Sequence, residues 1–490
     1  MSDTLATLQK ALAPKTGMRQ LPFPVESYEH PSRPFNYKHL LNLAAEAGPP
    51  DSISPFMLNP TSGLVPTAPV GTGPWYAFNA NLVGGYYIVS GDHLWRNIGG
   101  TTTDLGAVGT MVNPYPPDTI RPMVTIAMNP RAAVICVPPR LFYIYHDDPT
   151  LHEIDASGWE TNGAGTVTYI DGYWVVTSYG PGTTFVLSSL NDPASWPGDF
   201  ANVEGMVSIL LRAVTHRGQL WLLGAGGAEV WYDAGAPDFP FRRMEGVSIQ
   251  HGSIARSVAI LNGAIWWVTR ERLVVRSDGY SMKRISTHFV ERLLEPTDPE
   301  QCFATSYTDN GHGYYCLTLP DIGRTLCFDT LTEKWHDRSS AADGAGAWRP
   351  SHLARIGEAV YAGDASGMMY ILDPNGNTDN GVAMIRQATL PPLYVDGHRV
   401  FCARAQIELE TGDVNASINL DWSDDGGNHF SGGPRVLTTG VSGDPRKRVF
   451  TTRLGSFRER MFRLTTHDRT VFYNMTADVA APASQSGANS

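Results

Sequence analysis

The dominant pattern along the chain is a short run of aromatic and β-branched residues that follows a turn signal. Runs of this kind are typical of β-strands that begin directly after a tight turn. Clear copies are GGYYIV from Gly84, DGYWVV from Asp171, RGQLWLL from Arg217, NGAIWWV from Asn262, GHGYYCL from Gly311 and IGEAVYA from Ile356, and a weaker copy, RAAVICV, begins at Arg131. The repetition indicates that one supersecondary unit recurs along the chain.

The spacing of the copies gives the length of this unit. The glycines taken to mark them are Gly85, Gly172, Gly218, Gly263, Gly313 and Gly357, at intervals of 87, 46, 45, 50 and 44 residues. The first interval is about twice the others, and the weaker copy lies near its middle. A period near 45 residues falls in the range of propeller blades. We therefore predict an all-β chain whose residues 76–375 form a β-propeller of about seven blades.

Further strands and one helix fit the same pattern. Second strands follow many copies: HLWRNIG (93–99), AEVWYDAG (228–235), LVVRSDGY (273–280), TLCFDTLTEKW (325–335) and MMYILDP (368–374). A ring of such hairpin-rich blades leaves only short, protected strand edges. The segment ISTHFVERLLEP (285–296) is predicted to be a helix that ends at Pro296 and is inserted between blades.

Residues 1–75 are predicted to form a partly helical, proline-rich N-terminal extension. Its first twenty residues suggest a short helix followed by a linker, with Ser2 or Asp3 as N-cap, an apolar stripe of Leu5, Leu8 and Leu12, and Pro14 at the end. A helix this short is marginal in water, so it either docks on a partner or the main body, or is a frayed terminus. A second helical patch, YKHLLNLAAEAG, ends at Gly48.

The texture changes again after the propeller. Long alternating strands appear in residues 376–480: AQIELE, ASINLDW, RVFTTRL, RMFRLTT and TVFYNMTADV. They predict a separate β-sandwich of about 100 residues. Residues 481–490, APASQSGANS, have the composition of a disordered tail.

Composition narrows the classes of function. The net charge is −11, which argues against tight sequence-independent DNA binding but permits a conduit that surrounds DNA without holding it. The five cysteines are scattered and form no CxxC pair, which favours reduced thiols. No apolar run reaches the length of a membrane helix and no signal-peptide core is present, so no membrane insertion is expected, and the chain should remain where it is made unless a cell or particle releases it.

No catalytic, cofactor or metal site is predicted. The sequence contains no GxSxG, GxxxxGK[ST] or HExxH motif and no GxGxxG after a strand. The fourteen histidines are dispersed without metal-ligand spacing. A glycosidase would need two carboxylates across a cleft, and nothing singles out such a pair among the 48 acidic residues.

The sharpest local motif is SDDGGNHF, residues 423–430. It matches the Asp-box pattern through Ser423, Asp425, Gly427 and Phe430. Asp-boxes are common in sialidases, where they are structural hairpins remote from the catalytic carboxylates. Because an aspartate can bond to the N–H groups of its own turn, we interpret the motif as structural.

A calcium loop is a weaker interpretation of the same segment. Asp421, Ser423, Asp425 and Gly426 fit the first half of an EF-hand loop, but its last position is Gly432 instead of glutamate. We therefore do not predict a calcium ion here.

Seven basic residues cluster in the last domain. They are Arg446, Lys447, Arg448, Arg453, Arg458, Arg460 and Arg463. One interpretation is a patch that faces DNA or an acidic neighbour. The alternative, which strand alternation favours, is a solvated face paired with Glu459, Asp444 and Asp468.

Several stretches together resemble one family, the tail nozzle or hub proteins of short-tailed bacteriophages, also called packaged-DNA stabilisation proteins. The stretches are SYEHPSRPFNYKHLLNLAAEAGPP, FMLNPTSGLV, SLNDPASWPGDFANVEG, LWLLGAGGAEVWYDAGAPDFPFRRMEGVSIQHGSIARSVA, GYSMKRISTHFVE, LDWSDDGGNHFSGGP and RLGSFRERMFRL. They occur in the family's order over nearly the whole chain. The first twenty residues and the region near residue 132 show no close match.

The resemblance implies a structural role in the virion tail. Such proteins form a homo-oligomeric ring, usually a hexamer, below the portal and the tail adaptor. They extend the DNA channel, retain the packaged genome, support the needle, fibre or spike proteins and serve as conduit in DNA ejection. The chain would be synthesised in the host cytoplasm, and the resemblance carries over no catalytic residue.

Two other classes of protein use the same fold. One is a phage tail protein that binds or degrades host glycans, since propellers and Asp-boxes occur there too. The other is a host-type propeller that serves as an interaction scaffold, which would lack the N-terminal and C-terminal stretches quoted above. Those stretches favour the nozzle interpretation.

Overall fold

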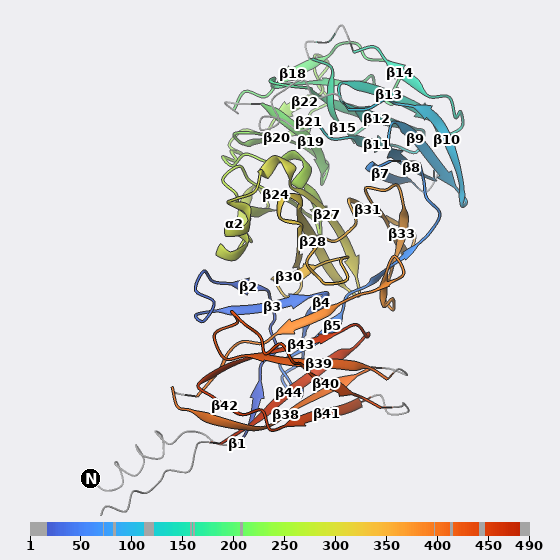
Figure 1. Cartoon of the computed structure of the whole chain (residues 1–490). Coiled ribbons are helices and arrows are strands. Elements are labelled where there is room, and N and C mark those ends of the chain that lie inside the picture. Colours follow the sequence, from blue (N-terminus) through green and yellow to red (C-terminus); the bar gives the residue numbers. More distant parts are fainter. Residues whose placement is uncertain are drawn as a thin grey trace, which may run out of the picture. The chain divides into compact units, whose positions relative to one another are not determined.

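The computed structural model describes residues 17–71, 73–81, 85–111, 122–156, 159, 162–205, 209–395, 397–411, 415–440 and 446–480. Its contacts divide the chain into two compact units. The larger unit comprises Leu64–Leu331 and Ala347–Pro374, and the smaller unit comprises Met1–Gly63, Thr332–Gly346 and Asn375–Ser490. Figure 1 labels the strands of both units. Residues up to Gly63 therefore associate with the C-terminal segments, whereas the sequence suggested a separate N-terminal extension.

The larger unit is a β-propeller built from antiparallel meanders. Five meanders of four strands form separate sheets in the described chain. They are β7 (Trp75–Asn81), β8 (Gly85–Ser90), β9 (His93–Ile98) and β10 (Thr101–Ala107); β11 (Thr125–Met128), β12 (Ala132–Val137), β13 (Arg140–Tyr145) and β14 (His152–Ile154); β15 (Ala164–Ile170), β16 (Tyr173–Ser178), β17 (Thr184–Leu187) and β18 (Phe200–Asn202); β19 (Leu210–His216), β20 (Gln219–Gly224), β21 (Ala228–Asp233) and β22 (Phe241–Arg243); β23 (Ala259–Leu261), β24 (Ala264–Val268), β25 (Val274–Asp278) and β26 (Ser281–Arg284). The all-β propeller expected from the repeat is confirmed.

The remaining strands complete the ring. The next blade begins with β27 (Phe303–Asp309), β28 (His312–Leu319) and β29 (Arg324–Asp329). The last blade combines β31 (His352–Ile356), β32 (Ala359–Gly363) and β33 (Met369–Asp373) with β6 (Gly63–Pro66) from the start of the propeller segment. Six blades of the described chain are thus consecutive in sequence, and one is composite. This refines the expectation of about seven units.

The ring is closed by pairing both ends of the propeller segment. Beyond β6, the backbone N–H of Thr67 donates to the carbonyl of Met369 at 2.8 Å, and that of Val70 donates to Gly367 at 3.0 Å. On the inner side, β31 of the last blade contacts β7 of the first. Residues distant in sequence therefore share one blade, which the repeat pattern alone did not reveal.

The repeated turns explain why the periodic glycines are needed. Asn262 and Gly263 between β23 and β24 both have positive φ, 49° and 68°, as do Asn310 and Gly311 between β27 and β28, 49° and 82°. Two successive positive φ values are typical of the tight hairpin turn that favours Asn-Gly. The marker chosen in the sixth copy, Gly313, was wrong, because it lies inside β28.

The predicted helical insertion is confirmed. Helix α2 (His288–Leu294) lies between β26 and β27, and the Thr287 hydroxyl accepts a hydrogen bond from the backbone N–H of Val290 at 3.5 Å. The propeller also contains three short 3₁₀ helices, Ala255–Ser257, Pro299–Gln301 and Pro320–Ile322. No helix among the described residues is long and apolar enough to cross a membrane.

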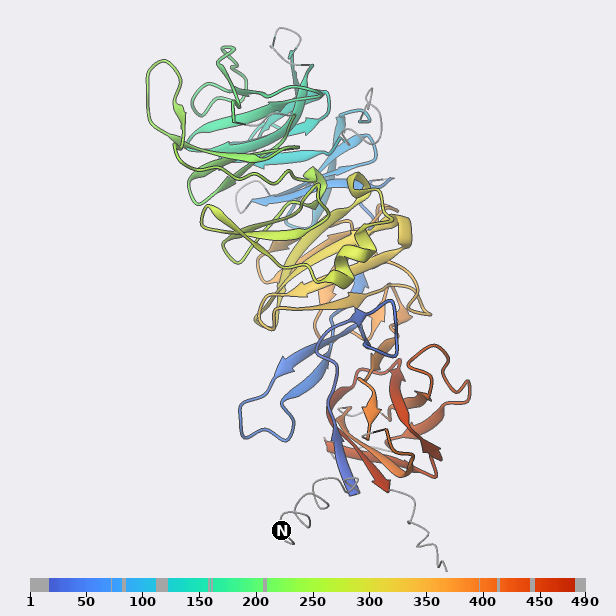
Figure 2. The ribbon, with the colours of Figure 1, turned by 90° about the vertical axis from the view of Figure 1, so that its left-hand side faces the viewer.

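The smaller unit contains two sheets around one core (Figure 2). One sheet has the order β4 (Leu43–Ala47), β5 (Phe56–Pro60), β44 (Val471–Ala480), β38 (Val400–Glu410) and β41 (Arg446–Thr452), with β1 (Gly17–Leu21) on β44 and β42 (Ser456–Phe457) on β38. The other contains β2 (Tyr28–Glu29), β3 (Tyr37–Leu41), β30 (Lys334–Arg338), β36 (Arg386–Thr389), β37 (Leu393–Tyr394), β39 (Ser417–Ser423), β40 (Arg435–Thr438) and β43 (Glu459–Thr466). Two short strands, β34 (Thr378–Asp379) and β35 (Val382–Ala383), pair with each other.

The helical patch predicted at residues 37–48 was wrong. This segment forms β3 and β4, separated by Asn42, whose φ of 52° would interrupt a helix. β3 pairs with β36 and β4 pairs with β5, so sheet partners decide the conformation against local helix propensity. The helix predicted at the N-terminus lies outside the described residues except for Gly17–Gln20, which belong to β1, and residues 481–490 also lie outside them.

Candidate functional site

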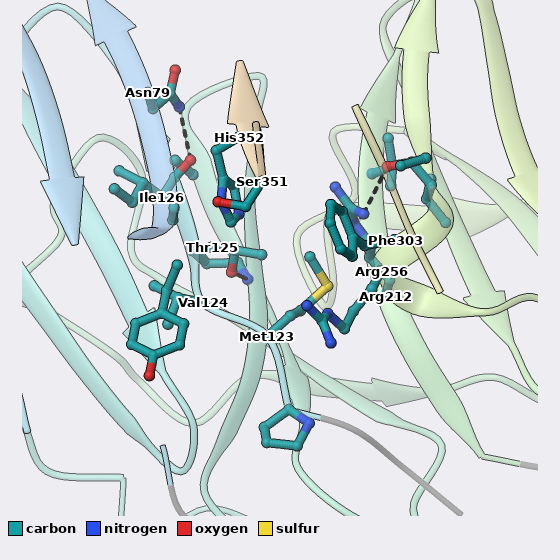
Figure 3. A pocket seen from close by; sticks show the side chains of 18 of the residues that line it. Asn79, Met123, Val124, Thr125, Ile126, Arg212, Arg256, Phe303, Ser351 and His352 are labelled. Carbon is teal, nitrogen blue, oxygen red and sulfur yellow. Dashed lines mark hydrogen bonds between the residues drawn. The ribbon is translucent and has the colours of Figure 1, made fainter. Parts of the chain in front are cut away.

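The innermost strands of the propeller surround a cavity of about 910 Å³. Residues from β7, β11, β15, β19 and β27 line it, together with the segments around β23 and β31 (Figure 3). The cavity therefore lies on the axis of the ring, within one unit. Its volume is in the range of small-molecule sites.

Polar side chains on the cavity wall largely bond to neighbouring strands. The Asn79 amide donates to the carbonyl of Ile126 at 2.8 Å, which joins β7 to β11. The Thr125 hydroxyl accepts from the backbone N–H of Val167 at 2.8 Å, and Thr168 bonds to Thr215 at 2.9 Å. These contacts connect successive blades and make a preorganised wall.

Arginines supply the charge of the cavity. One Arg212 nitrogen donates to the carbonyls of Ala255 and Val258 at 2.8 and 2.9 Å. Burial lowers the pKa of the Arg212 guanidinium to about 10, so the group stays protonated at neutral pH. The Arg256 guanidinium lies 5.5 Å from the centre of the Phe303 ring.

The cavity lacks the groups that acid–base or metal chemistry needs. None of the described residues that line it is Asp or Glu. Across the described chain, no group of three or more His, Cys, Asp or Glu side chains is placed to hold a metal ion. Sequence reasoning named no site residue and also missed these arginines, since each stands alone in an ordinary strand and only ring closure brings them together.

The cysteines are structural. All five are buried and free in the structure. Burial raises the pKa of the Cys402 thiol to about 11 and that of Cys302 to about 12, and it raises the pKa of Cys136 as well. Because the thiolate is the nucleophilic form, these thiols are unreactive at neutral pH.

The Asp-box is a self-contained turn in the smaller unit. The Asp425 carboxylate accepts from the Ser423 hydroxyl at 2.7 Å and from the backbone N–H of His429 at 2.9 Å. Gly426 and Gly427 have φ of 71° and 87°, as the turn requires. The structure thus supports the structural interpretation of this motif.

Replacing Asp425 is expected to affect stability through this turn. The bond from the His429 N–H, followed by those from the Ser423 and His429 side chains, lowers the pKa of Asp425 far below its usual value. The carboxylate's contribution is therefore complete above the ordinary Asp pKa of about 4 and falls as pH drops below it. We expect Asp425→Ala to lower the free energy of unfolding by about 1 kcal/mol at pH 7.

Thermal unfolding measured from pH 7 to pH 3 would test this, with the exposed neighbour Asn428→Ala as control. The difference between wild type and Asp425→Ala should shrink as the pH falls. A difference that is constant or grows toward acid would contradict the assigned role.

The segment considered for calcium is occupied by protein contacts. One oxygen of Asp421 accepts from the backbone N–H of Ser431 at 3.1 Å, and the other accepts from Arg463 at 2.6 Å. Asp425 is held inside its own turn. The donor set of a calcium loop is therefore not available here.

The basic cluster is divided among acidic partners of the same unit. The ion pairs are Arg446 and Arg448 with Glu408, Arg460 with Asp424 at 2.6 Å, and Arg463 with Asp421 at 2.6 Å. The side chain of Arg460 is only 2% exposed, so it does not lie on a solvated face. The pairing expected with Glu459 and Asp468 was wrong, and Asp444 lies outside the described residues.

Comparison with solved structures gives only distant similarity. YCF48 from Cyanidioschyzon merolae aligns with a TM-score of 0.42 at 9% identity, covering 64% of this chain and 99% of that one. The extracellular domain of the putative one component system BT4673 from B. thetaiotaomicron aligns with a TM-score of 0.45 at 10% identity, covering 84% and 59%. The N-terminal domain of Nup159 gives 0.39 at 8% identity, covering 73% and 99%.

Comparison with families is decisive. No curated protein matches the chain. A family model described as "Bacteriophage P22 Gp10, beta-propeller" matches residues 20–377, which is well over half of the sequence and includes every blade of the propeller. The chain therefore belongs to this family of phage tail nozzle, or packaged-DNA stabilisation, proteins.

Proposed function

We propose that the protein is the subunit of a tail nozzle ring that extends the DNA channel below the portal and adaptor. The ring, a homohexamer, retains the packaged genome and serves as conduit when DNA is ejected. Its partners are further copies of itself, the tail adaptor, and the needle, fibre or spike proteins. The observation that carries this proposal is the family match over residues 20–377.

Physical features of the chain support a conduit. The net charge of −11 disfavours a tight grip on phosphates, so DNA that passes such a subunit would not be held by general electrostatics. Many basic side chains of the smaller unit are engaged by its own carboxylates. The closed propeller offers a rigid body whose strand edges are short and protected.

We also propose that the subunit has no enzymatic activity of its own. The family is a structural one. The axial cavity presents arginines and apolar side chains, and the Asp425 carboxylate is held in its turn instead of facing a cleft. The alternative, a tail protein that binds or degrades glycans, has no specific geometric support, and a glycan-array and hydrolysis assay should show neither activity.

Electron microscopy of phage tails labelled on this chain tests the proposal. We expect a six-fold ring between the adaptor and the tail tip. A different symmetry would overturn the hexamer, and a position at the fibre tips would favour the receptor-binding alternative.

A gel-shift titration of the purified protein provides an independent check. We expect duplex DNA to bind with a dissociation constant weaker than about 1 µM at physiological salt, because the chain has excess negative charge. Tight, sequence-independent binding would contradict a passive conduit.

A further inference from the structure

The axial cavity contains a buried cation without an acidic partner. Arg212 projects from β19 at the wall of the 910 Å³ cavity, and both of its printed hydrogen bonds go to backbone carbonyls, of Ala255 and Val258. No carboxylate of the described residues forms an ion pair with it. By contrast, Arg349 at the same wall lies 3.7 Å from the Asp364 carboxylate.

Charge in such an enclosed place needs a counter-charge. Burial already opposes the protonated form of Arg212 and lowers its pKa. A second guanidinium, that of Arg256, lies at the same cavity without any Asp or Glu among the described lining residues. Two cations facing a partly desolvated space attract an anion more strongly there than they would in water.

The rest of the wall selects the body of such an anion. Figure 3 shows Met123, Val124 and Ile126 at the cavity together with the two arginines and Phe303. Aliphatic, methionine and aromatic side chains of this kind surround apolar or aromatic ligands in small-molecule sites. Most polar groups of the wall are bonded to neighbouring strands, which leaves the guanidinium groups as the polar determinants.

We propose that the axial cavity of the propeller binds a small organic anion, an aromatic or apolar body carrying one phosphate, sulfonate or carboxylate group, with Arg212 and Arg256 as its anion-binding residues. The site lies wholly within the propeller and does not depend on the role proposed for the ring. An anion there would complete the charge balance on the axis and tie β19 to the segment before β23.

A matched pair of fluorescent probes tests the proposal on the full-length protein. The probe 8-anilinonaphthalene-1-sulfonate has an aromatic body and a sulfonate, and N-phenyl-1-naphthylamine has nearly the same body without charge. We expect one sulfonate probe per chain, bound about tenfold or more tightly than the neutral probe, the size of one charge-assisted contact.

Variants assign the binding to the arginines. Arg212→Met should weaken the sulfonate probe about tenfold and leave the neutral probe unchanged. Arg212→Lys should retain part of the preference, and Arg256→Met, measured in parallel, covers the case in which Arg212→Met fails to fold. Arg355→Met is the control, because Arg355 is an exposed arginine paired with Glu358 outside the cavity.

Two outcomes would overturn the proposal. One is equal affinity of wild-type protein for the charged and neutral probes. The other is undiminished binding of the sulfonate probe by the folded Arg212→Met and Arg256→Met proteins, which would place the dye elsewhere on the surface.

Discussion

Replacing Leu64 with alanine is expected to destabilise the propeller by about 2–5 kcal/mol. Leu64 lies on β6, the strand that closes the ring, and its side chain is 0% exposed. It packs in a cluster that includes Tyr314 of one blade and Tyr370 and Leu372 of the next. The truncation therefore leaves a cavity at the point where the two ends of the propeller meet.

The neighbouring residue of the same strand is the natural control. Val65 is 41% exposed, so Val65→Ala removes little buried surface and should change stability by less than about 0.5 kcal/mol. Thermal unfolding gives the magnitude, and hydrogen exchange in β33 locates it. Equal effects of the two substitutions would show that β6 does not close the ring as described.

Replacing Trp266 with alanine should cost about 3–5 kcal/mol. The indole is 0% exposed on β24 and lies 5.7 Å from the Tyr315 ring and 5.5 Å from the Phe328 ring of the following blade. Its Nε1 donates to the carbonyl of Leu261 at 3.0 Å. Loss of this ring removes an inter-blade contact and a hydrogen bond together.

Two further variants separate these contributions. Trp266→Phe keeps most of the ring contact but loses the N–H donor, so it should cost clearly less than Trp266→Ala. Tyr232→Ala removes an aromatic side chain that is 43% exposed and should be nearly neutral. Denaturant unfolding followed by hydrogen exchange in β24 and β28 would measure the difference, and a neutral Trp266→Ala would refute the assigned packing.

The repeat was readable from sequence because blade turns use local chemistry. Pairs such as Asn262–Gly263 adopt positive φ at both positions, and this requirement recurs once per blade. Helix α2 was also readable, because Thr287 caps it and its apolar residues have helical spacing. Signals of this kind depend only on neighbours in the chain.

Other elements depended on distant partners and were misassigned or missed. Residues 37–48 have helical propensity, yet β3 and β4 form because sheet neighbours are available. The acidic partners of the basic cluster were misassigned, since Glu408 and Asp424 reach the arginines only through strand pairing. Local propensity is a weak prior where tertiary pairing competes with it.

By itself the sequence determined the all-β propeller, the blade period, the inserted helix, the structural nature of the Asp-box and the family resemblance. Each of these depends on short-range turn chemistry or on motifs that stand in the chain. Only the tertiary structure decided how β6 closes the ring, that the N-terminal strands belong to the smaller unit, and that Arg212 and Arg256 meet at one cavity. These features join residues far apart in sequence, and such contacts form only when the whole sheet arrangement buries its apolar faces together.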